Sequence, residues 1–234
     1  MIHSHPTFEQ LSSFASGSAP LSISLGLSGH LEYCQTCASQ VKRLQTLGAV
    51  MMEQIKVPVT SDDVMERLMS NTIDRIAQTE SAVASPSSEA AVVIDDAEIN
   101  THSGYRLPKV LRQFIKQDYN ELKWTTLSPS FKIATLLKDT DGTQIALSRV
   151  KPGGAMPHHK HMGDEMTLVL EGSFSDESGL FEAGDFIMRD SSHKHHPVVT
   201  MDGECICLMV LDGPVQFTGF FTRLLNPLLR LNHS

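Results

Sequence analysis

The stretch that most constrains the fold begins at Gly153 and reads GGAMPHHKHMGDEMTLVLEG, ending at Gly172. His159 and His161 are two residues apart, so on a β-strand their side chains face the same side. Glu165 follows four residues later and can point into the same cavity. Imidazole and carboxylate ligands suit Zn, Fe, Mn or Ni, and the ligand types alone do not select among these metals. The spacing therefore predicts a metal site inside a β structure, with an exposed histidine-rich loop as the alternative.

The sequence around this stretch is typical of an antiparallel β-barrel or sandwich. From Tyr105 onward, brief apolar runs such as MTLVLEG, FEAGDFIM, HPVVT and CICLMVL recur at a spacing of roughly ten residues. Asp141-Gly142 in LLKDTDGTQIAL indicates a hairpin. Before this region, residues 81–104 are rich in Ser, Ala and acidic residues and lose all periodicity, which predicts a flexible linker.

Residues 1–80 have helical patterns. Thr7 and Gln10 have the spacing of a capping box, and Gly17 can end the short helix that follows. A second helical segment runs from about residue 22 to residue 47, with Gly48 as its expected end.

A third helix is expected after Thr60, which is a candidate N-cap. Its apolar stripe is either the core of a small bundle or a docking face, because flexible methionines suit a surface that adapts to a partner. The stripe consists of Met65, Leu68, Met69, Ile73 and Ile76.

The second constellation is HLEYCQTC, which contains His30, Cys34 and Cys37. Spacings of four and three place these side chains on one face of a helix. A structural zinc site needs four nitrogen or sulfur ligands, so a fourth must come from elsewhere, and His5 or His3 lies close to the start of the first helix. Two buried thiols remain an alternative, whereas a redox pair would follow a strand in a βαβ context that is absent. The pattern favours zinc, and either His5 or His3 could complete the ligand set.

Composition narrows the functional class. The chain has 234 residues and a formal net charge of −8, which disfavours direct nucleic-acid binding and fits a basic protein partner. No apolar run approaches the ~20 residues needed to cross a bilayer, and the first residues lack the pattern of a signal peptide. We therefore expect a cytoplasmic protein without membrane association, whose four cysteines stay reduced.

Both motifs resemble known families. A histidine near the start followed by H-x3-C-x2-C resembles the zinc-binding anti-sigma domain that inhibits bacterial extracytoplasmic-function sigma factors. The spacing G-x5-H-x-H-x3-E-x6-G is similar to the first motif of the cupin barrels, and HPVV resembles their later histidine segment. That segment selects His195 as the fourth barrel ligand, with His193, which shares its strand parity, as the alternative.

In this order the two motifs resemble the ChrR-type zinc anti-sigma factors. The resemblance implies an α+β fold of two domains, with a zinc-stabilised helical bundle at 1–80, the linker at 81–104 and a cupin β-barrel at 105–234. It implies inhibition of a sigma factor until an oxidant of the singlet-oxygen or organic-peroxide class releases it, and no enzymatic activity. The implied ligands are His5, His30, Cys34 and Cys37 for zinc, and His159, His161, Glu165 and His195 for zinc or another divalent transition metal.

Two alternatives stay open. The barrel ligands alone are also compatible with a metal-dependent cupin enzyme, a dioxygenase or isomerase with a helical appendage. Cys205 and Cys207 share one strand face, where buried packing is favoured over a redox role.

Overall fold

The computed structural model describes residues 2–56, 61–82, 104–116, 118–138, 143–156, 159–161, 163–213 and 215–217. The chain divides into two compact units, one formed by Met1–Gly48 with Ile99–Ser234 and one by Ala49–Glu98. Helices precede an antiparallel β structure, so the predicted α+β class is confirmed. Most of the predicted linker lies outside the described residues, and the predicted domain boundaries stay a prediction.

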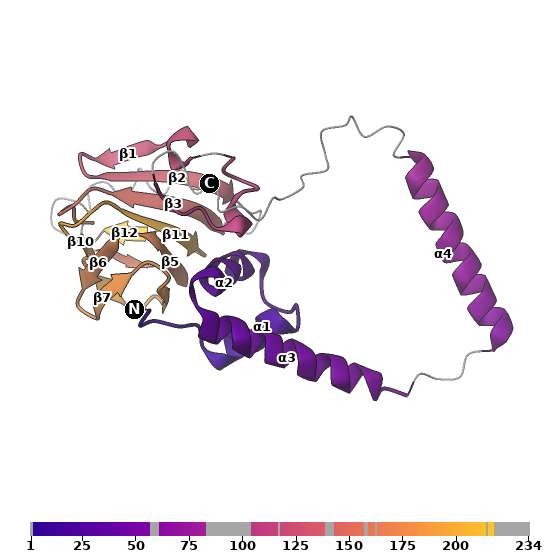
Figure 1. Ribbon diagram of the computed structural model, residues 1–234. Coiled ribbons are helices and arrows are strands. Elements are labelled where there is room, and N and C mark those ends of the chain that lie inside the picture. Colours follow the sequence, from indigo (N-terminus) through magenta and orange to yellow (C-terminus); the bar gives the residue numbers. More distant parts are fainter. Residues whose placement is uncertain are drawn as a thin grey trace. The chain divides into compact units, whose positions relative to one another are not determined.

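Four α-helices and two short 3-10 helices are found in the described part of the chain. Figure 1 shows the α-helices in violet and magenta, before the strands in the chain. Their bounds are α1 Phe8–Ala15, α2 Leu21–Tyr33, α3 Gln35–Glu53, α4 Asp62–Ala82, η1 Lys109–Leu111 and η2 Tyr119–Glu121.

The first helix begins and ends as predicted. The Thr7 side chain accepts a hydrogen bond from the Gln10 amide at 3.3 Å, and the Gln10 side chain accepts one from the Thr7 amide at 2.8 Å. Gly17 follows the C-cap with φ +73°, a left-handed conformation that costs glycine little. The capping box and the glycine stop are therefore both confirmed.

The predicted second helix is wrong in one respect, because it is two helices that meet at Cys34. This residue has an extended conformation, with φ −112° and ψ 98°. Its amide still donates to the His30 carbonyl, and its own carbonyl accepts from the Ala38 amide. Cys34 thus ends α2 and begins α3, which continues through the exposed Gly48 to Glu53, past the predicted end.

The larger sheet is antiparallel and has six strands in the order β1-β2-β3-β11-β5-β8. The pairing of β2 with β3 confirms the predicted hairpin, although Asp141 and Gly142 lie outside the described residues. The strands are β1 Thr125–Ser128, β2 Phe131–Lys138, β3 Gln144–Val150, β5 Glu165–Glu171, β8 Phe186–Arg189 and β11 Cys205–Leu211.

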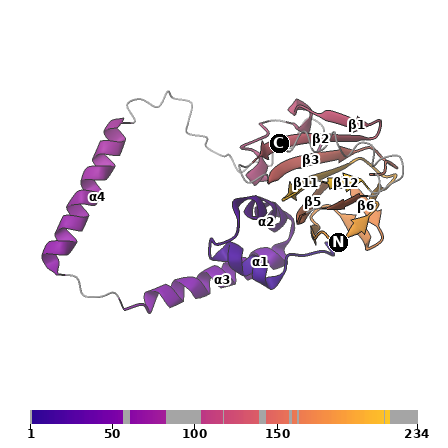
Figure 2. The ribbon, with the colours of Figure 1, turned by 180° about the vertical axis from the view of Figure 1, so that it is seen from behind.

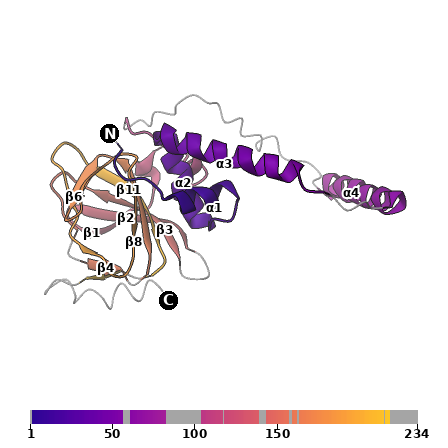
Figure 3. The same ribbon diagram turned by 90° about the horizontal axis from the view of Figure 1, so that it is seen from below.

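Two three-stranded sheets complete the β structure, in the orders β10-β6-β7 and β12-β4-β9. In Figure 3 the strands surround a common interior, and α1 and α2 lie outside it. The bounds are β4 His159–His161, β6 Ser173–Asp176, β7 Gly179–Glu182, β9 Lys194–His195, β10 Val198–Val199 and β12 Val215–Phe217. The predicted barrel or sandwich is therefore present.

The middle of the large sheet, at strands β5 and β11, is buried on both faces. Every residue of β11 is buried, and so is every residue of β5 except the last. Alternate residues belong to two different cores, one inside the barrel and one shared with the helices. The strands contribute Met166, Leu168, Leu170, Ile206, Leu208 and Val210 to the core that also contains Leu11, Leu25, Leu27 and Val41 of the helices.

Helix α2 covers the outer face of this sheet, where it contacts β5, β8 and β11 (Figures 1 and 2). Two glycines permit the close approach. A Cβ atom at Gly29 would lie 2.6 Å from Leu168 Cδ2, and one at Gly26 would lie 2.1 Å from Met166 Cε. The Tyr33 hydroxyl at the end of α2 donates to the Leu170 carbonyl at 3.0 Å. The glycines that weaken α2 as an isolated helix therefore serve its packing on β5.

The described residues between 49 and 82 expose many apolar side chains to solvent. The stripe predicted for the third helix lies on α4, and all five of its apolar side chains are exposed. Four further apolar residues after Gly48 are also exposed: Val50, Met51, Met52 and Ile55. Among the described residues, no helix is both long enough and apolar enough to span a membrane.

The close packing of α2 predicts opposite effects for one substitution at two glycines. Gly29→Ala gains about 1 kcal/mol of helix propensity, but the displaced Leu168 side chain costs about 1–3 kcal/mol of overpacking. We expect a lower free energy of unfolding for Gly29→Ala. Gly48→Ala in α3 meets no atom within 4 Å and should be stabilising. Denaturant titration of both variants measures the difference, and a stabilising Gly29→Ala contradicts the packing argument.

Candidate metal centres

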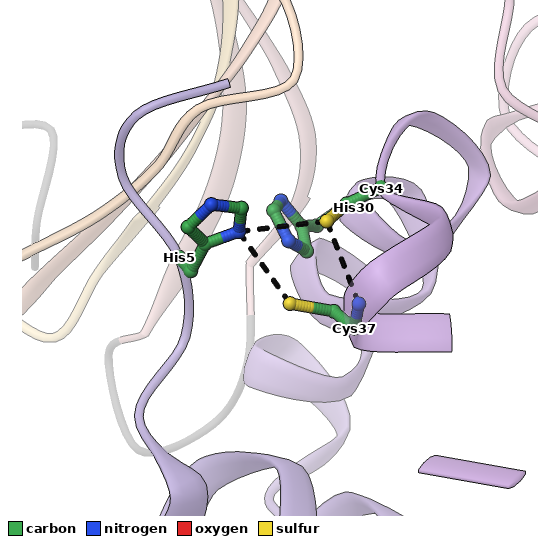
Figure 4. Close-up of side chains that lie close together, drawn as sticks. All are labelled: His5, His30, Cys34 and Cys37. Atoms are coloured by element: carbon green, nitrogen blue, oxygen red, sulfur yellow. Dashed lines mark hydrogen bonds between the residues drawn. The ribbon is translucent and has the colours of Figure 1, made fainter. Parts of the chain in front are cut away.

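The first centre brings together four side chains from the N-terminal segment and from the region of α2 and α3 (Figure 4). His5 lies on the segment before α1, His30 in the last turn of α2, Cys34 at the junction and Cys37 in the first turn of α3. One ligand atom from each lies within 4.8 Å of all the others, and the three residues other than His5 are buried. The end of α2 and the start of α3 meet at Cys34, yet the side chains of His30, Cys34 and Cys37 remain close to one another.

The distances fit a tetrahedral site. The Nδ1 atom of His5 lies 3.5 Å from the Sγ atoms of both Cys34 and Cys37. Bond lengths of about 2.3 Å for Zn–S and about 2.0–2.1 Å for Zn–N give ligand atoms about 3.5 Å apart at a tetrahedral angle. The residues present therefore fit a zinc ion with two thiolates and two imidazoles.

His30 carries the strongest sign of a bound cation. Its Nδ1 lies 2.7 Å from the Gly184 carbonyl oxygen, which can only accept, so Nδ1 holds the proton. The other ring nitrogen, Nε2, is buried and has no hydrogen-bond partner among the described residues. An unpaired buried nitrogen is costly unless a ligand occupies its lone pair. Ligating histidines commonly donate their second N–H to a carbonyl in this way.

Without a metal ion, burial favours the neutral forms of the His30 imidazole and the Cys37 thiol. Desolvation lowers the pKa of His30, despite the opposing hydrogen bond to Gly184. Burial, followed by the neighbouring Cys34 thiol, raises the pKa of Cys37 to about 12. A metal ion at this centre would replace the thiol protons and supply the positive charge that two thiolates need.

The structure distinguishes the two early histidines. The backbone amide of His3 donates to Asp185 Oδ1 at 2.6 Å, and its exposed ring lies 4.0 Å from Glu182. His5, and not His3, belongs to the cluster. Ligation by His5 stays a prediction.

The second centre lies inside the barrel and contains His159, Glu165 and His195, all buried. The Nε2 atoms of the two histidines are 2.9 Å apart, and His159 pairs with His195 in the β4–β9 register. The Thr167 hydroxyl donates to Glu165 Oε1 at 2.6 Å. Two imidazoles and a carboxylate converge here, as the sequence predicts.

Two predictions for this centre have different outcomes. His161 lies in β4, two residues from His159, but its side chain is outside the described part of the structure. The alternative ligand His193 is exposed and lies 2.9 Å from Asp190, away from the cluster. The roles of His161 and of the other predicted ligands stay predictions.

Sequence reasoning missed the residues that orient His195. Asp176 Oδ2 lies 3.1 Å from His195 Nδ1 and accepts a hydrogen bond from Arg189 at 2.5 Å. The Asp176 side chain is fully buried. A carboxylate on Nδ1 orients the His195 ring with Nε2 toward His159 and makes Nε2 a better metal ligand. No spacing rule connects these residues, because they come from three different strands.

The barrel interior also contains a small cavity and two thiols. The cavity, of about 30 Å³, is lined by Glu165, His195 and both barrel cysteines among others. It is large enough for about one water molecule. The Sγ atoms of Cys205 and Cys207 lie 3.6 Å apart in buried surroundings, and the Cys205 thiol and burial raise the pKa of Cys207 well above its usual value.

Comparison with known proteins matches both halves of the chain. Residues 112–216 match the family model of the ChrR cupin-like domain. The anti-sigma-E factor ChrR of Cereibacter sphaeroides is 30% identical over 231 residues, which are 98% of this chain and 99% of that protein. The crystal structure of Rhodobacter sphaeroides SigE in complex with the anti-sigma ChrR matches with a TM-score of 0.67 and 25% identity, over 90% of this chain and 99% of the matched chain.

The support of His195 by Asp176 predicts a selective loss of barrel metal. Asp176→Asn removes the negative charge next to His195 and Arg189, so we expect metal affinity to fall by about 10–100-fold. The measurement is retained metal after dialysis against graded chelator, in a Cys34→Ser/Cys37→Ser background that leaves only the barrel centre. Asp190→Asn removes a carboxylate from the exposed His193 and is the matched control. Equal losses in both variants contradict the assignment.

Proposed function

Because this chain belongs to the family of ChrR-type anti-sigma factors, we propose that it binds an extracytoplasmic-function sigma factor and withholds it from RNA polymerase. The observation that carries the proposal is the match over nearly the whole chain to an anti-sigma factor, together with a solved relative that is in complex with SigE. The proposed partner is a protein, with no direct contact to nucleic acid. Since sigma factors act in the cytoplasm, we place the protein there.

The exposed apolar side chains of residues 49–82 support a docking role for this region. Met65, Leu68, Met69, Ile73 and Ile76 recur at helical spacing on α4, and each is at least 47% exposed. Contiguous exposed apolar surface on a soluble protein marks an interaction site. Flexible methionine side chains suit a surface that adapts to its partner. A helix that lays such a face against the sigma factor is the mode of binding that we propose.

Zinc at the first centre would have a structural role. The four residues supply a complete tetrahedral set, and a closed set leaves no position for a substrate. When bound, the ion would supply the positive charge that holds two thiolates and two imidazoles together. His5, His30, Cys34 and Cys37 would then join the N-terminal segment to the junction of α2 and α3. The proposed consequence is a fixed start for α3, the helix that leads to the docking region.

The barrel is proposed to serve the response that ends inhibition. Its buried His159, Glu165 and His195 fit zinc or another divalent transition metal. An oxidant of the singlet-oxygen or organic-peroxide class is the proposed signal. A metal-dependent cupin enzyme is the alternative. The match over nearly the whole chain is to an anti-sigma factor, which supports a regulatory barrel over a catalytic one.

The docking proposal predicts a position-specific effect of charge on α4. Met69→Glu places a carboxylate in the apolar stripe and should weaken binding of the partner sigma factor by at least about tenfold, as expected for an interface hot spot. Asn71→Glu introduces the same charge at an exposed position on the opposite face. The dissociation constants of both purified variants give the comparison. A Met69→Glu variant that binds as tightly as the control contradicts the proposed face.

If zinc has a structural role at the first centre, a variant that loses this zinc should also bind the sigma factor more weakly. Cys37→Ser removes one of four ligands, so we expect about one zinc fewer per chain and weaker sigma-factor binding. Cys205→Ser makes the same change at a buried thiol outside the cluster and should keep the first zinc. Elemental analysis and a pull-down with the sigma factor provide the measurements. Full binding by a zinc-deficient Cys37→Ser chain would argue against a structural ion.

A further inference from the structure

The first metal centre is contacted by the barrel as well as by the helices. The turn between β7 and β8, which contains Gly184 and Asp185, contacts the elements that carry two of its four ligand residues. We propose that this turn belongs to the first metal centre, with Asp185 as the positioning residue for His5. The inference deepens the proposed function and rests on its assignment of a metal to this centre.

Asp185 holds the segment that bears His5. Its Oδ1 atom accepts hydrogen bonds from the backbone amides of His3 at 2.6 Å and Ser4 at 2.7 Å. Its Oδ2 atom accepts one from the Glu182 amide at 2.7 Å, which fixes the carboxylate within its own turn. Asp185 is 0% exposed. A buried carboxylate with three amide donors is a rigid anchor, because each hydrogen bond to a charged group is stronger than a neutral one.

The backbone of the same turn and strand adds two further contacts. The Phe186 amide donates to the Ser4 carbonyl at 3.0 Å, so the segment before His5 is held on both sides. The Gly184 carbonyl accepts from His30 Nδ1 at 2.7 Å and directs Nε2 away from the turn, toward the other ligands. His5 and His30, which lie 25 positions apart in the chain, are thereby both held in place by residues 184–186 of the barrel.

Gly184 is suited to this place by its conformation and its lack of a side chain. Its φ of +97° lies in the region that favours glycine. A Cβ atom there would lie 2.8 Å from both Ile2 Cδ1 and Tyr33 Cβ. The N-terminal segment and the end of α2 therefore meet on this residue, and a larger one would push them apart.

The chemical consequence concerns the exposed ligand. His30, Cys34 and Cys37 are buried on or between helices, whereas His5 is exposed and lies on a segment without regular structure. Without the anchor, His5 would lose the position that places its Nδ1 near both sulfur atoms. A ligand that dissociates more often lets the ion leave faster, so the barrel turn controls the lifetime of the bound metal.

The test uses the full chain, with Co²⁺ as the probe and Asp185→Asn as the variant. Thiolates bound to Co²⁺ give a charge-transfer absorption that reports the first centre, because the described ligands of the barrel centre are imidazoles and a carboxylate. We expect Asp185→Asn to lower Co²⁺ affinity by about 10–100-fold, as for other residues that orient metal ligands. Transfer of Zn²⁺ to a chromogenic chelator should accelerate accordingly. Asp202→Asn, an exposed carboxylate elsewhere on the barrel, should change neither.

A second variant separates positioning from folding. Gly184→Ala leaves the Asp185 carboxylate in place but disturbs Ile2 and Tyr33, so it should also shorten metal lifetime, while circular dichroism reports an intact fold. If both variants keep wild-type affinity and transfer rates, the inference is wrong and the metal assignment stands. A wild-type chain without the thiolate absorption would overturn the metal assignment and the inference with it.

Discussion

The apolar outer face of the six-stranded sheet is the constraint on which the rest of this structure depends. Strands β5 and β11 present no polar face to water, so a second layer has to cover them. Helix α2 does so at a distance that Gly26 and Gly29 permit. The first metal centre lies at the C-terminal end of this helix and is therefore built against the barrel and not apart from it.

Strand β8 connects the first metal centre, which lies near its start, to the second, which lies near its end. The residues before β8 hold His5 and His30 through Asp185 and the Gly184 carbonyl. The last residue of β8 is Arg189, which pairs with Asp176, the carboxylate on His195. A displacement of this four-residue strand would reach both centres. The packing thus gives the barrel a direct mechanical connection to the ligands of the helical part.

Sequence reasoning found what is encoded locally and missed what depends on distant packing. The histidine and cysteine spacings predicted both clusters, because ligands a few residues apart stay together whether the chain is helical or turns at Cys34. The apolar run CICLMVL predicted a strand of the barrel, but not that β11 would be buried along its whole length. The helical layer that covers this strand could not be predicted, because the packing of Gly26 and Gly29 against β5 depends on the tertiary structure. Asp185 is 181 residues from Ser4, and no periodicity relates such pairs.

The junction at Cys34 connects the first candidate metal centre to the start of α3. The Cys37 amide lies 3.5 Å from Cys34 Sγ, so the sulfur sits where an N-cap side chain accepts a hydrogen bond from the start of α3. A thiolate held there by a metal ion is a better acceptor than a thiol, and its charge favours the positive end of the helix. Removing a bound ion would weaken this cap and would release the first turn of α3 from the centre. Helix α3 continues to Glu53, so the change begins in the element that leads to the exposed apolar residues.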